Sequence, residues 1–238
     1  TWISLIGITL AVFALVAALS VRSGFRTEIV DTILGSNSHI TLYKTLTKDQ
    51  YGNIDRGFED YDEVASSLLS LPGVKRSAPL IRSQIMATYD NRNIGLEVFG
   101  ISYDNLLGLE RIANPEEYSG DINNFKNGIA IGSGVARELG VQIGDKIKLI
   151  SPNGVRTAFG TSPRVKQFKI VYIFTAGRYD IDRTRSYLPF SIAQEYFNRE
   201  GLADEIEVLL DNPSNLTEAI SNLSLIHISE PTRRRGIS

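Results

Sequence analysis

The pattern of apolar and charged positions divides the chain sharply into two parts. No charged residue occurs from Trp2 to Val21, and all of the 25 Lys and Arg and 27 Asp and Glu residues lie beyond this segment. A helix of about 20 residues extends about 30 Å, the hydrocarbon thickness of a bilayer, and a buried soluble helix seldom has apolar residues on every face over that length. We therefore predict a transmembrane helix at residues 1–21, followed by a water-soluble domain.

A cleaved secretory signal is the main alternative for this segment. Such a signal has an apolar core of about 7 to 15 residues and a small-x-small cleavage site. Ala18-Leu19-Ser20 resembles such a site, but the apolar run is longer than a signal requires. A spanning helix therefore fits better.

The helix is expected to continue past the membrane in amphipathic form. Phe25, Ile29 and Ile33 recur every four residues among charged ones, and Gly35 is a typical helix stop. We assign residues 22–35 to this extension. Its apolar stripe either packs on the soluble domain or faces lipid or a partner helix at the membrane surface.

Strand and helix patterns alternate through residues 36–222, which predicts an α+β domain of mixed strands and helices in two subdomains. The expected strands are 39–43, 74–89, 94–101, 128–131, 146–150, 167–175 and 205–210, and residues 44–58 are expected to form a loop. The expected helices are 61–71, capped by Asp60 or Asp62, then 133–139, and a short helix capped by Ser191 with Ala193, Tyr196 and Phe197 facing inward.

A polar segment, Pro152 to Arg164, separates two of these strands. It contains glycines and prolines and one aromatic residue, Phe159, next to Gly160. Loops longer than about 12 residues in compact domains are often functional. We interpret the segment as a long hairpin loop whose Phe inserts into an apolar groove of a partner, the alternative being a tip with no role.

The composition argues against several classes of chemistry. The chain has no Cys, which excludes disulfides and thiolate metal sites, and its net charge of −2 gives no reason to expect nucleic acid. The glycine turn at residues 132–134 has Arg137 where a dinucleotide fingerprint needs Gly or Ala. Asp180 and Asp182 lie among arginines, which favours surface ion pairs over a catalytic dyad. We predict no catalytic, cofactor-binding or metal-binding residue.

The C-terminal residues have a different origin from the rest. Leu223 to Arg233 (LSLIHISEPTR) matches the peptide that a transposon-end sequencing adapter encodes in one reading frame. We therefore expect residues 223–238 to be a non-native tail and the domain to be incomplete after Asn222. Without the tail the net charge changes from −2 to −4, and His39 is the only histidine.

The order of motifs resembles the LolC and LolE permeases of lipoprotein-releasing ABC transporters. The resemblance covers nearly all of residues 2–213, with Tyr172 where a Gly is common. Its blocks are LSVRSGFRTEIVDTILGSNSHI after the apolar helix, Val98-Phe99-Gly100-Ile101, IAIGSGVARELGVQIGDKIKLISP, and the most specific block, SPRVKQFKIVYIFTAGRYDIDRTRSYLPFSIAQEYF.

The resemblance implies a MacB-like periplasmic domain between the first and second of four transmembrane helices, in the inner membrane of a Gram-negative bacterium. It implies a non-enzymatic subunit that works with a separate ATPase, which holds ATP and Mg, and with a second permease subunit in a homo- or heterodimer. Such transporters extract acylated lipoproteins from membrane lipid and pass them to a periplasmic carrier, LolA. Whether this chain is LolC-like or LolE-like stays open.

The resemblance also assigns roles to residues. By position, the segment between the two strands matches a hook that grips the carrier, with candidates Pro152, Asn153, Gly154, Thr157, Phe159, Gly160, Pro163 and Arg164. The first helix and its extension can touch acyl chains, with candidates Phe13, Leu19, Phe25 and Ile29. The alternatives are a MacB-like efflux permease, an FtsX-like mechanotransmission regulator and a membrane-anchored enzyme.

Overall fold

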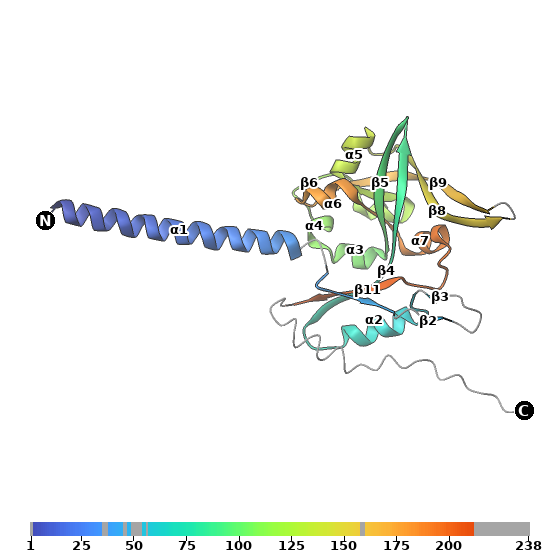
Figure 1. Ribbon diagram of the computed structural model, residues 1–238, viewed down its shortest axis with the longest axis horizontal. Coiled ribbons are helices and arrows are strands. Elements are labelled where there is room, and N and C mark those ends of the chain that lie inside the picture. Colours follow the sequence, from blue (N-terminus) through green and yellow to red (C-terminus); the bar gives the residue numbers. More distant parts are fainter. Residues whose placement is uncertain are drawn as a thin grey trace, which may run out of the picture.

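The computed structural model describes residues 2–34, 38–44, 47–48, 54–55, 57–157 and 160–211. Of these, residues 26–34, 47–48, 54–55, 153–157 and 160–161 are described by their backbone alone. The fold is α+β, as predicted, with one long helix and a domain of mixed strands and helices (Figure 1). The predicted non-native tail and Phe159 lie outside the described residues.

Helix α1 (Trp2–Leu34) is one continuous helix of 33 residues. Its first part, Trp2–Phe25, is long and apolar enough to cross a membrane, and none of it is buried against the domain. The helix runs through the boundary predicted at Val21 without a break, as expected for an extension that continues beyond the membrane. The apolar side chains of Trp2–Phe25 therefore have no covering partner among the described residues.

Most of the domain is built on a nine-stranded sheet. The strand order is β1-β11-β4-β5-β10-β7-β9-β6, and β8 pairs with β4 and β9. The strands are β1 (Ile40–Tyr43), β4 (Val74–Tyr89), β5 (Arg92–Ile101), β6 (Glu117–Gly120), β7 (Ile129–Gly132), β8 (Lys146–Thr157), β9 (Gly160–Thr175), β10 (Arg185–Pro189) and β11 (Glu205–Leu210).

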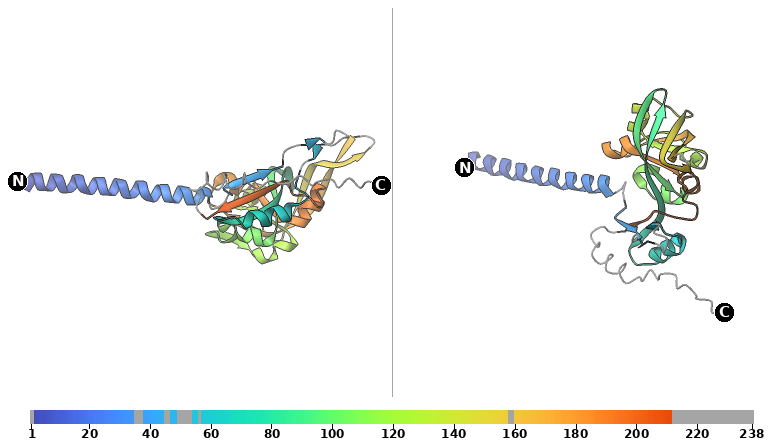
Figure 2. Two further views of the ribbon diagram at one scale, coloured as in Figure 1. Left: turned by 90° about the horizontal axis from the view of Figure 1, so that it is seen from below. Right: turned by 45° about the vertical axis from the view of Figure 1, so that its right-hand side comes forward.

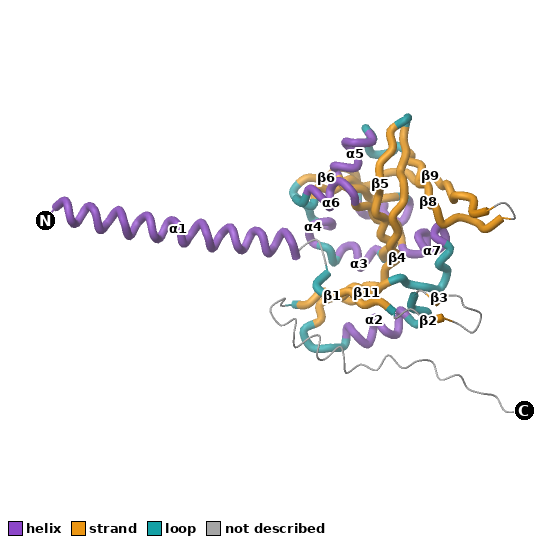
Figure 3. Tube along the Cα trace, in the orientation of Figure 1, coloured by secondary structure: helices purple, strands orange, loops and turns teal. Residues whose placement is uncertain are grey.

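Strand β4 belongs to two lobes of the domain. Its first half, to Leu80, pairs with β11, and its second half, from Ile81, pairs with β5 and β8. The smaller lobe contains β1, β11 and helix α2 (Tyr61–Leu69), which share a core around Leu68 and Ile206 (Figure 3).

The larger lobe has a core on each face of its sheet, because neighbouring residues of a strand point to opposite faces. Ile81 and Val98 lie in one core, and Leu80 and Phe99 in the other. Helices α5 (Ser133–Leu139) and α7 (Phe190–Phe197) contribute to the first core, and α3 (Tyr103–Leu107), α4 (Glu110–Ala113), the 3-10 helix η1 (Ile122–Asn127) and α6 (Tyr179–Thr184) to the second.

The loop predicted at residues 44–58 is partly wrong. Strands β2 (Thr47–Lys48) and β3 (Ile54–Asp55) pair within it, and Phe58 is buried and bridges to Ala203. The predicted caps also differ. Asp60 occupies the N-cap of α2 without a side-chain bond, and Asp62 lies inside the helix.

The cap predicted for α7 is wrong as well. Ser191 is the second residue of α7, and Pro189 is the N-cap. Proline has no N–H and a fixed φ, so it suits a helix start where that N–H would have no intrahelical partner. Ala193, Tyr196 and Phe197 are buried, as predicted.

Candidate functional site

The segment Pro152 to Arg164 forms a hairpin rather than the predicted loop. Strands β8 and β9 continue through it as an antiparallel ladder, from Lys146 opposite Lys169 to Thr157 opposite Gly160. This part of the strands was not predicted, because its sequence is polar and has no alternation of apolar and polar residues. The predicted loop is therefore wrong, because most of this segment belongs to β8 and β9. The segment does connect the strands predicted at 146–150 and 167–175.

The hairpin leaves the sheet beyond Ile150. Strand β4 pairs with β8 only where Met86, Ala87 and Thr88 face residues 150, 149 and 148. Past this point β8 has no partner on that side among the described strands, and the two arms project from the domain at the end far from α1 (Figure 1).

An irregularity in the ladder marks the place of departure. Ser151 pairs with Arg164 and Val155 with Ser162, so three residues of β8 face one residue of β9. Such a bulge raises the local twist and redirects the strand. Pro152 and Pro163 are both exposed here, and a proline cannot donate a ladder hydrogen bond. The bulge and the prolines together account for the separation of the hairpin from the sheet.

The root of the hairpin is held by the C-terminal end of α7. The Arg164 guanidinium donates to the carbonyl oxygens of Glu195 at 2.6 Å and Tyr196 at 3.1 Å. The last carbonyls of a helix have no intrahelical donor and carry the negative end of its dipole, so a cation there is stabilising. Arg164 is thus directed at the domain rather than into solvent.

A buried tyrosine completes this anchor. The Tyr196 hydroxyl lies 2.8 Å from the carbonyl oxygen of Leu149 and 3.2 Å from that of Arg164, so it contacts both arms. Burial raises the pKa of Tyr196 to about 12, which keeps the hydroxyl protonated as a donor. Lys166 and Glu195 form a further ion pair at 3.0 Å, but both side chains are exposed and such pairs contribute about 0–1 kcal/mol.

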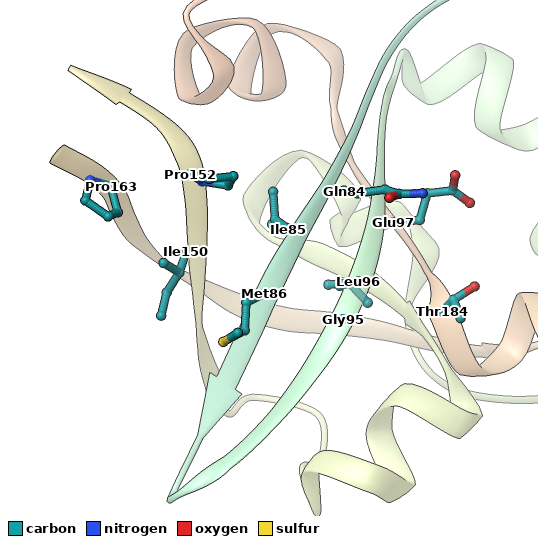
Figure 4. A pocket seen from close by; sticks show the side chains of 10 residues that line it. All are labelled: Gln84, Ile85, Met86, Gly95, Leu96, Glu97, Ile150, Pro152, Pro163 and Thr184. Atoms are coloured by element: carbon teal, nitrogen blue, oxygen red, sulfur yellow. The ribbon is translucent and has the colours of Figure 1, made fainter. Parts of the chain in front are cut away.

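An open groove of about 610 Å³ lies at the base of the hairpin (Figure 4). Met86 is 48% exposed on its floor, and a Cβ added at Gly95 would meet no atom within 4 Å. Pro152 and Pro163 lie on one side, and Glu97 and Thr184 on the other. The lining residues are Gln84, Ile85, Met86, Gly95, Leu96, Glu97, Ile150, Pro152, Pro163 and Thr184.

The charge at the rim of this groove is neutralised. Arg82 donates to one oxygen of the Glu97 carboxylate from Nε at 2.9 Å and from Nη2 at 2.7 Å. The Arg82 guanidinium thus balances the negative charge of Glu97. The remaining surface of the groove is mainly apolar. Pro152 and Pro163 at the base of the hairpin thus form part of a mainly apolar groove.

The predicted hook residues have different positions in this arrangement. Pro152 and Pro163 line the groove, and Arg164 anchors the root. By their backbone, Asn153 and Gly154 lie in the bulge of β8, and Thr157 lies opposite Gly160 at the end of the ladder. Phe159 lies outside the described residues.

The predicted lipid-contact residues lie on α1. Phe13, Leu19 and Phe25 are 72%, 53% and 67% exposed, and Ile29 is placed on α1 by its backbone alone. Helix and hairpin leave the domain at opposite ends, so the two predicted sets are not brought together (Figure 1).

The sequence did not predict three features of this region. These are the contact of Tyr196 with the hairpin and the positions of Met86 and Gly95 in the groove. Tyr196 was predicted as inward-facing but not as a partner of both arms. Gly95, inside an otherwise alternating strand, was a usable signal, because such a glycine often marks a place where another chain can approach.

The arginine-rich segment was predicted to hold surface ion pairs, and this is correct for Asp180 and wrong for Asp182. Asp180 pairs with Arg178 at 2.7 Å. Asp182 is buried and its Oδ1 accepts the Ala176 N–H at 2.6 Å. Burial raises the pKa of Asp182, although its bonds to backbone N–H groups oppose this. Its role is to hold the turn between β9 and α6.

The glycine turn at residues 132–134 packs against the backbone of α6. A Cβ at Gly132 would lie 2.2 Å from the Asp182 carbonyl oxygen, so this glycine permits a close approach of backbones. Among the described residues, no group of three or more His, Cys, Asp and Glu side chains is placed to hold a metal ion.

Comparison with known proteins gives a consistent family. A family model described as the MacB-like periplasmic core domain matches residues 1–225. The lipoprotein-releasing system transmembrane protein LolC of Neisseria meningitidis serogroup B is 26% identical over 217 residues, which cover 90% of this chain and 50% of the relative. The corresponding LolE of Haemophilus influenzae is 26% identical over 218 residues, 88% of this chain and 50% of the relative.

The chain thus spans about half the length of the curated relatives it matches. Among solved structures, the periplasmic region of MacB from Actinobacillus actinomycetemcomitans matches with a TM-score of 0.46 and 10% identity, over 77% of this chain and 80% of that one. The resemblance to LolC and LolE that the motifs indicated is confirmed by the sequence matches.

Proposed function

The chain belongs to the family of MacB-like periplasmic core domains, and from this premise we propose that it is part of a permease subunit of a lipoprotein-releasing ABC transporter. The names and identities of the LolC and LolE relatives support this. In this proposal α1 is the first of four transmembrane helices in a bacterial inner membrane, and the domain is periplasmic. The remaining helices belong to the half of the relatives that this chain does not span.

The proposed work is physical rather than chemical. Withdrawing an acyl chain from lipid costs about 0.8 kcal/mol for each CH₂ group, so removing a lipoprotein with several chains requires an external source of energy. We assign that source to a separate ATPase subunit that holds ATP and Mg. The permease, paired with a second permease subunit, supplies an apolar path to which Phe13, Leu19, Phe25 and Ile29 of α1 would contribute.

One observation carries the proposal for the domain. The β8–β9 hairpin projects at the end opposite to α1, and Arg164 and Tyr196 fix its root on α7. A fixed protrusion beside an apolar groove can hold a soluble carrier at a distance from the membrane. Because its root is already ordered, binding costs less conformational entropy than it would for a loose loop.

Shortening the hairpin tests this role. Deletion of residues 157–161, or Phe159→Ala, is expected to weaken capture of a purified LolA-type carrier at least tenfold in a pull-down with the full chain. The thermal unfolding midpoint should stay within about 2 °C of the parent value, because none of the three described cores contains these residues. Unchanged carrier affinity in a folded variant would remove the hook assignment.

A MacB-like efflux permease is the second candidate, because the matching family model is named for MacB. An FtsX-like regulator of a cell-wall hydrolase would use the same hairpin on another partner. Photocrosslinking from position 159 in cells separates these functions. A lipoprotein carrier as the captured protein supports lipoprotein release, whereas an outer-membrane duct component or an amidase activator contradicts it.

A further inference from the structure

The domain has one end close to the membrane helix and one end far from it. In Figures 1 and 2, α6 lies at the end where α1 leaves the domain, and the β8–β9 hairpin lies at the other. Strand β9 runs between these two ends. It has 16 residues, which at about 3.3 Å per residue extend about 50 Å.

Two exposed tyrosines lie at the membrane-proximal end of β9. Tyr179 opens α6, four residues after β9 ends, and is 75% exposed. Tyr118 of β6 pairs with Phe174 of β9 and is 64% exposed. Among described residues outside α1, no large apolar or aromatic side chain is more exposed than Tyr179.

The ring of Tyr179 is held in place although it is exposed. Arg183 donates from Nη1 to the Tyr179 hydroxyl, and its guanidinium carbon lies 5.5 Å from the ring centroid. Arg183 in turn forms an ion pair with Glu138 of α5. Arg183 therefore holds the tyrosine in one orientation while its ring stays exposed.

Chain length allows this end to lie near the bilayer. The apolar span ends at Phe25, and residues 26–34 extend α1 by about 13 Å. The chain from Leu34 to the start of β1 at Ile40 adds at most about 20 Å. The headgroup layer on each side is about 5–8 Å thick, so the end of the domain beside α1 is within reach of this layer.

We propose that Tyr179 and Tyr118 form a membrane-contact surface that enters the phospholipid headgroup layer. Tyrosine is enriched at this depth because its ring is apolar and its hydroxyl is polar. The arginines here are paired with Asp180 and Glu138, so the rings rather than net charge provide the attraction. Contact is therefore expected with zwitterionic lipid and with little dependence on salt. The inference rests on α1 spanning the membrane as in the proposed function.

The sequence offers a direct test, because Trp2 is the only tryptophan. In the full chain, Trp2→Phe combined with Tyr179→Trp places a single reporter at the contact surface. The chain is reconstituted in phosphatidylcholine vesicles whose acyl chains are brominated near the headgroup. The matched control is Trp2→Phe with Val165→Trp, on the distal half of β9, where Val165 is 55% exposed.

We expect the emission of the tryptophan at 179 to be quenched and shifted to shorter wavelength, and that at 165 to be unaffected. Tyr118→Trp in the same background should behave as Tyr179→Trp does. Equal emission at 179 with and without bromine, while Trp2 of the parent chain is quenched, would overturn the contact surface and leave the spanning helix intact. An unquenched Trp2 would overturn both. Quenching at 179 only with anionic lipid would also contradict the inference.

Discussion

The domain contains two long hairpins, β4–β5 and β8–β9, that differ in how they relate to the sheet. The β4–β5 ladder pairs every residue from Ile81 opposite Gly100 to Tyr89 opposite Arg92 without a shift. The β8–β9 ladder shifts register at residues 151–155 and has an exposed proline on each arm. Both hairpins contribute residues to the two cores of the larger lobe, but none of the described residues among 152–164 of the second hairpin belongs to a core.

The turns of the two hairpins fit this difference. Asp90 and Asn91 both have positive φ, at 43° and 67°, as a two-residue turn of type I′ requires. That turn matches the twist of its strands, so the ladder stays regular up to its exposed tip. Regular pairing thus goes with a structural role in β4–β5, and the bulged β8–β9 hairpin is the one that we propose contacts another molecule.

The largest effect is expected from a change in the β4–β5 hairpin. A Cβ at Gly100 would lie 2.3 Å from the Ala193 Cβ and 3.1 Å from the Ile81 Cβ. Gly100→Val should lower the free energy of unfolding by about 3 kcal/mol, because overpacking forces backbone shifts. Chemical denaturation of the domain measures this.

Gly95 on the same strand is the matched control. A Cβ at Gly95 meets nothing within 4 Å, so Gly95→Val should change stability by at most about 0.5 kcal/mol. Equal destabilisation by the two variants would contradict the packing assigned to β5. Because Gly95 lies in the groove, its variant is expected to alter partner binding instead.

A smaller and more local effect is expected at the root of β8–β9. Arg164→Met removes two charge-assisted hydrogen bonds to the end of α7 and should cost about 2 kcal/mol locally. Hydrogen exchange of residues 151–164 should accelerate while the β4–β5 amides keep their protection. Lys166→Met removes the exposed pair with Glu195 and the contact of Lys166 with the Phe168 ring, and should change little.

If Arg164→Met accelerated exchange throughout the sheet, the hairpin would be a structural part of the domain and the contrast between the hairpins would be lost. If exchange changed only in residues 151–164, carrier affinity should fall in the same variant with the fold intact. The two measurements together separate anchoring of the hairpin from folding of the domain.

The smallest change in stability is expected at His39, outside both hairpins, and serves as a baseline for the changes in the hairpins. The Leu210 N–H donates to His39 Nδ1 at 3.0 Å, which requires that nitrogen to be unprotonated, and burial lowers the pKa of His39 below 6.5. The unfolded chain therefore binds this proton at higher pH than the folded chain, so stability should fall as pH drops below about 6.5. His39→Asn, which retains an acceptor, should flatten this part of the pH profile in denaturation experiments.

The sequence predicted those elements whose patterns are local. The strands at 74–89 and 94–101 follow from alternation on either side of a polar turn, and they agree with β4 and β5 to within two residues at each end. Helix α5 ends at Gly140 in the left-handed conformation, as its glycine indicated. These features depend on residues close together in the chain.

Elements that depend on distant partners were not predicted. Phe58 is buried next to Ala203, with which it forms a β-bridge. Strand β10 lies between β5 and β7, and neither of these strands is next to β10 in the sequence. The short helices between Tyr103 and Asn127 have too few turns to show a period. In the candidate site, the prolines and Arg164 were identified, but the anchor on α7 and the groove floor come from tertiary packing alone.

Strand β9 also has a mechanical consequence. It is a single strand from the tyrosines at one end of the domain to the hairpin at the other, without an interruption among its described residues. If a body about 50 Å long rocks by about 10° on the membrane, its far end moves by about 9 Å. This is roughly twice the spacing between neighbouring strands of a sheet. With the tyrosine end on the bilayer, as we propose, small tilts of that end would become displacements of the far end large enough to release or engage a bound protein.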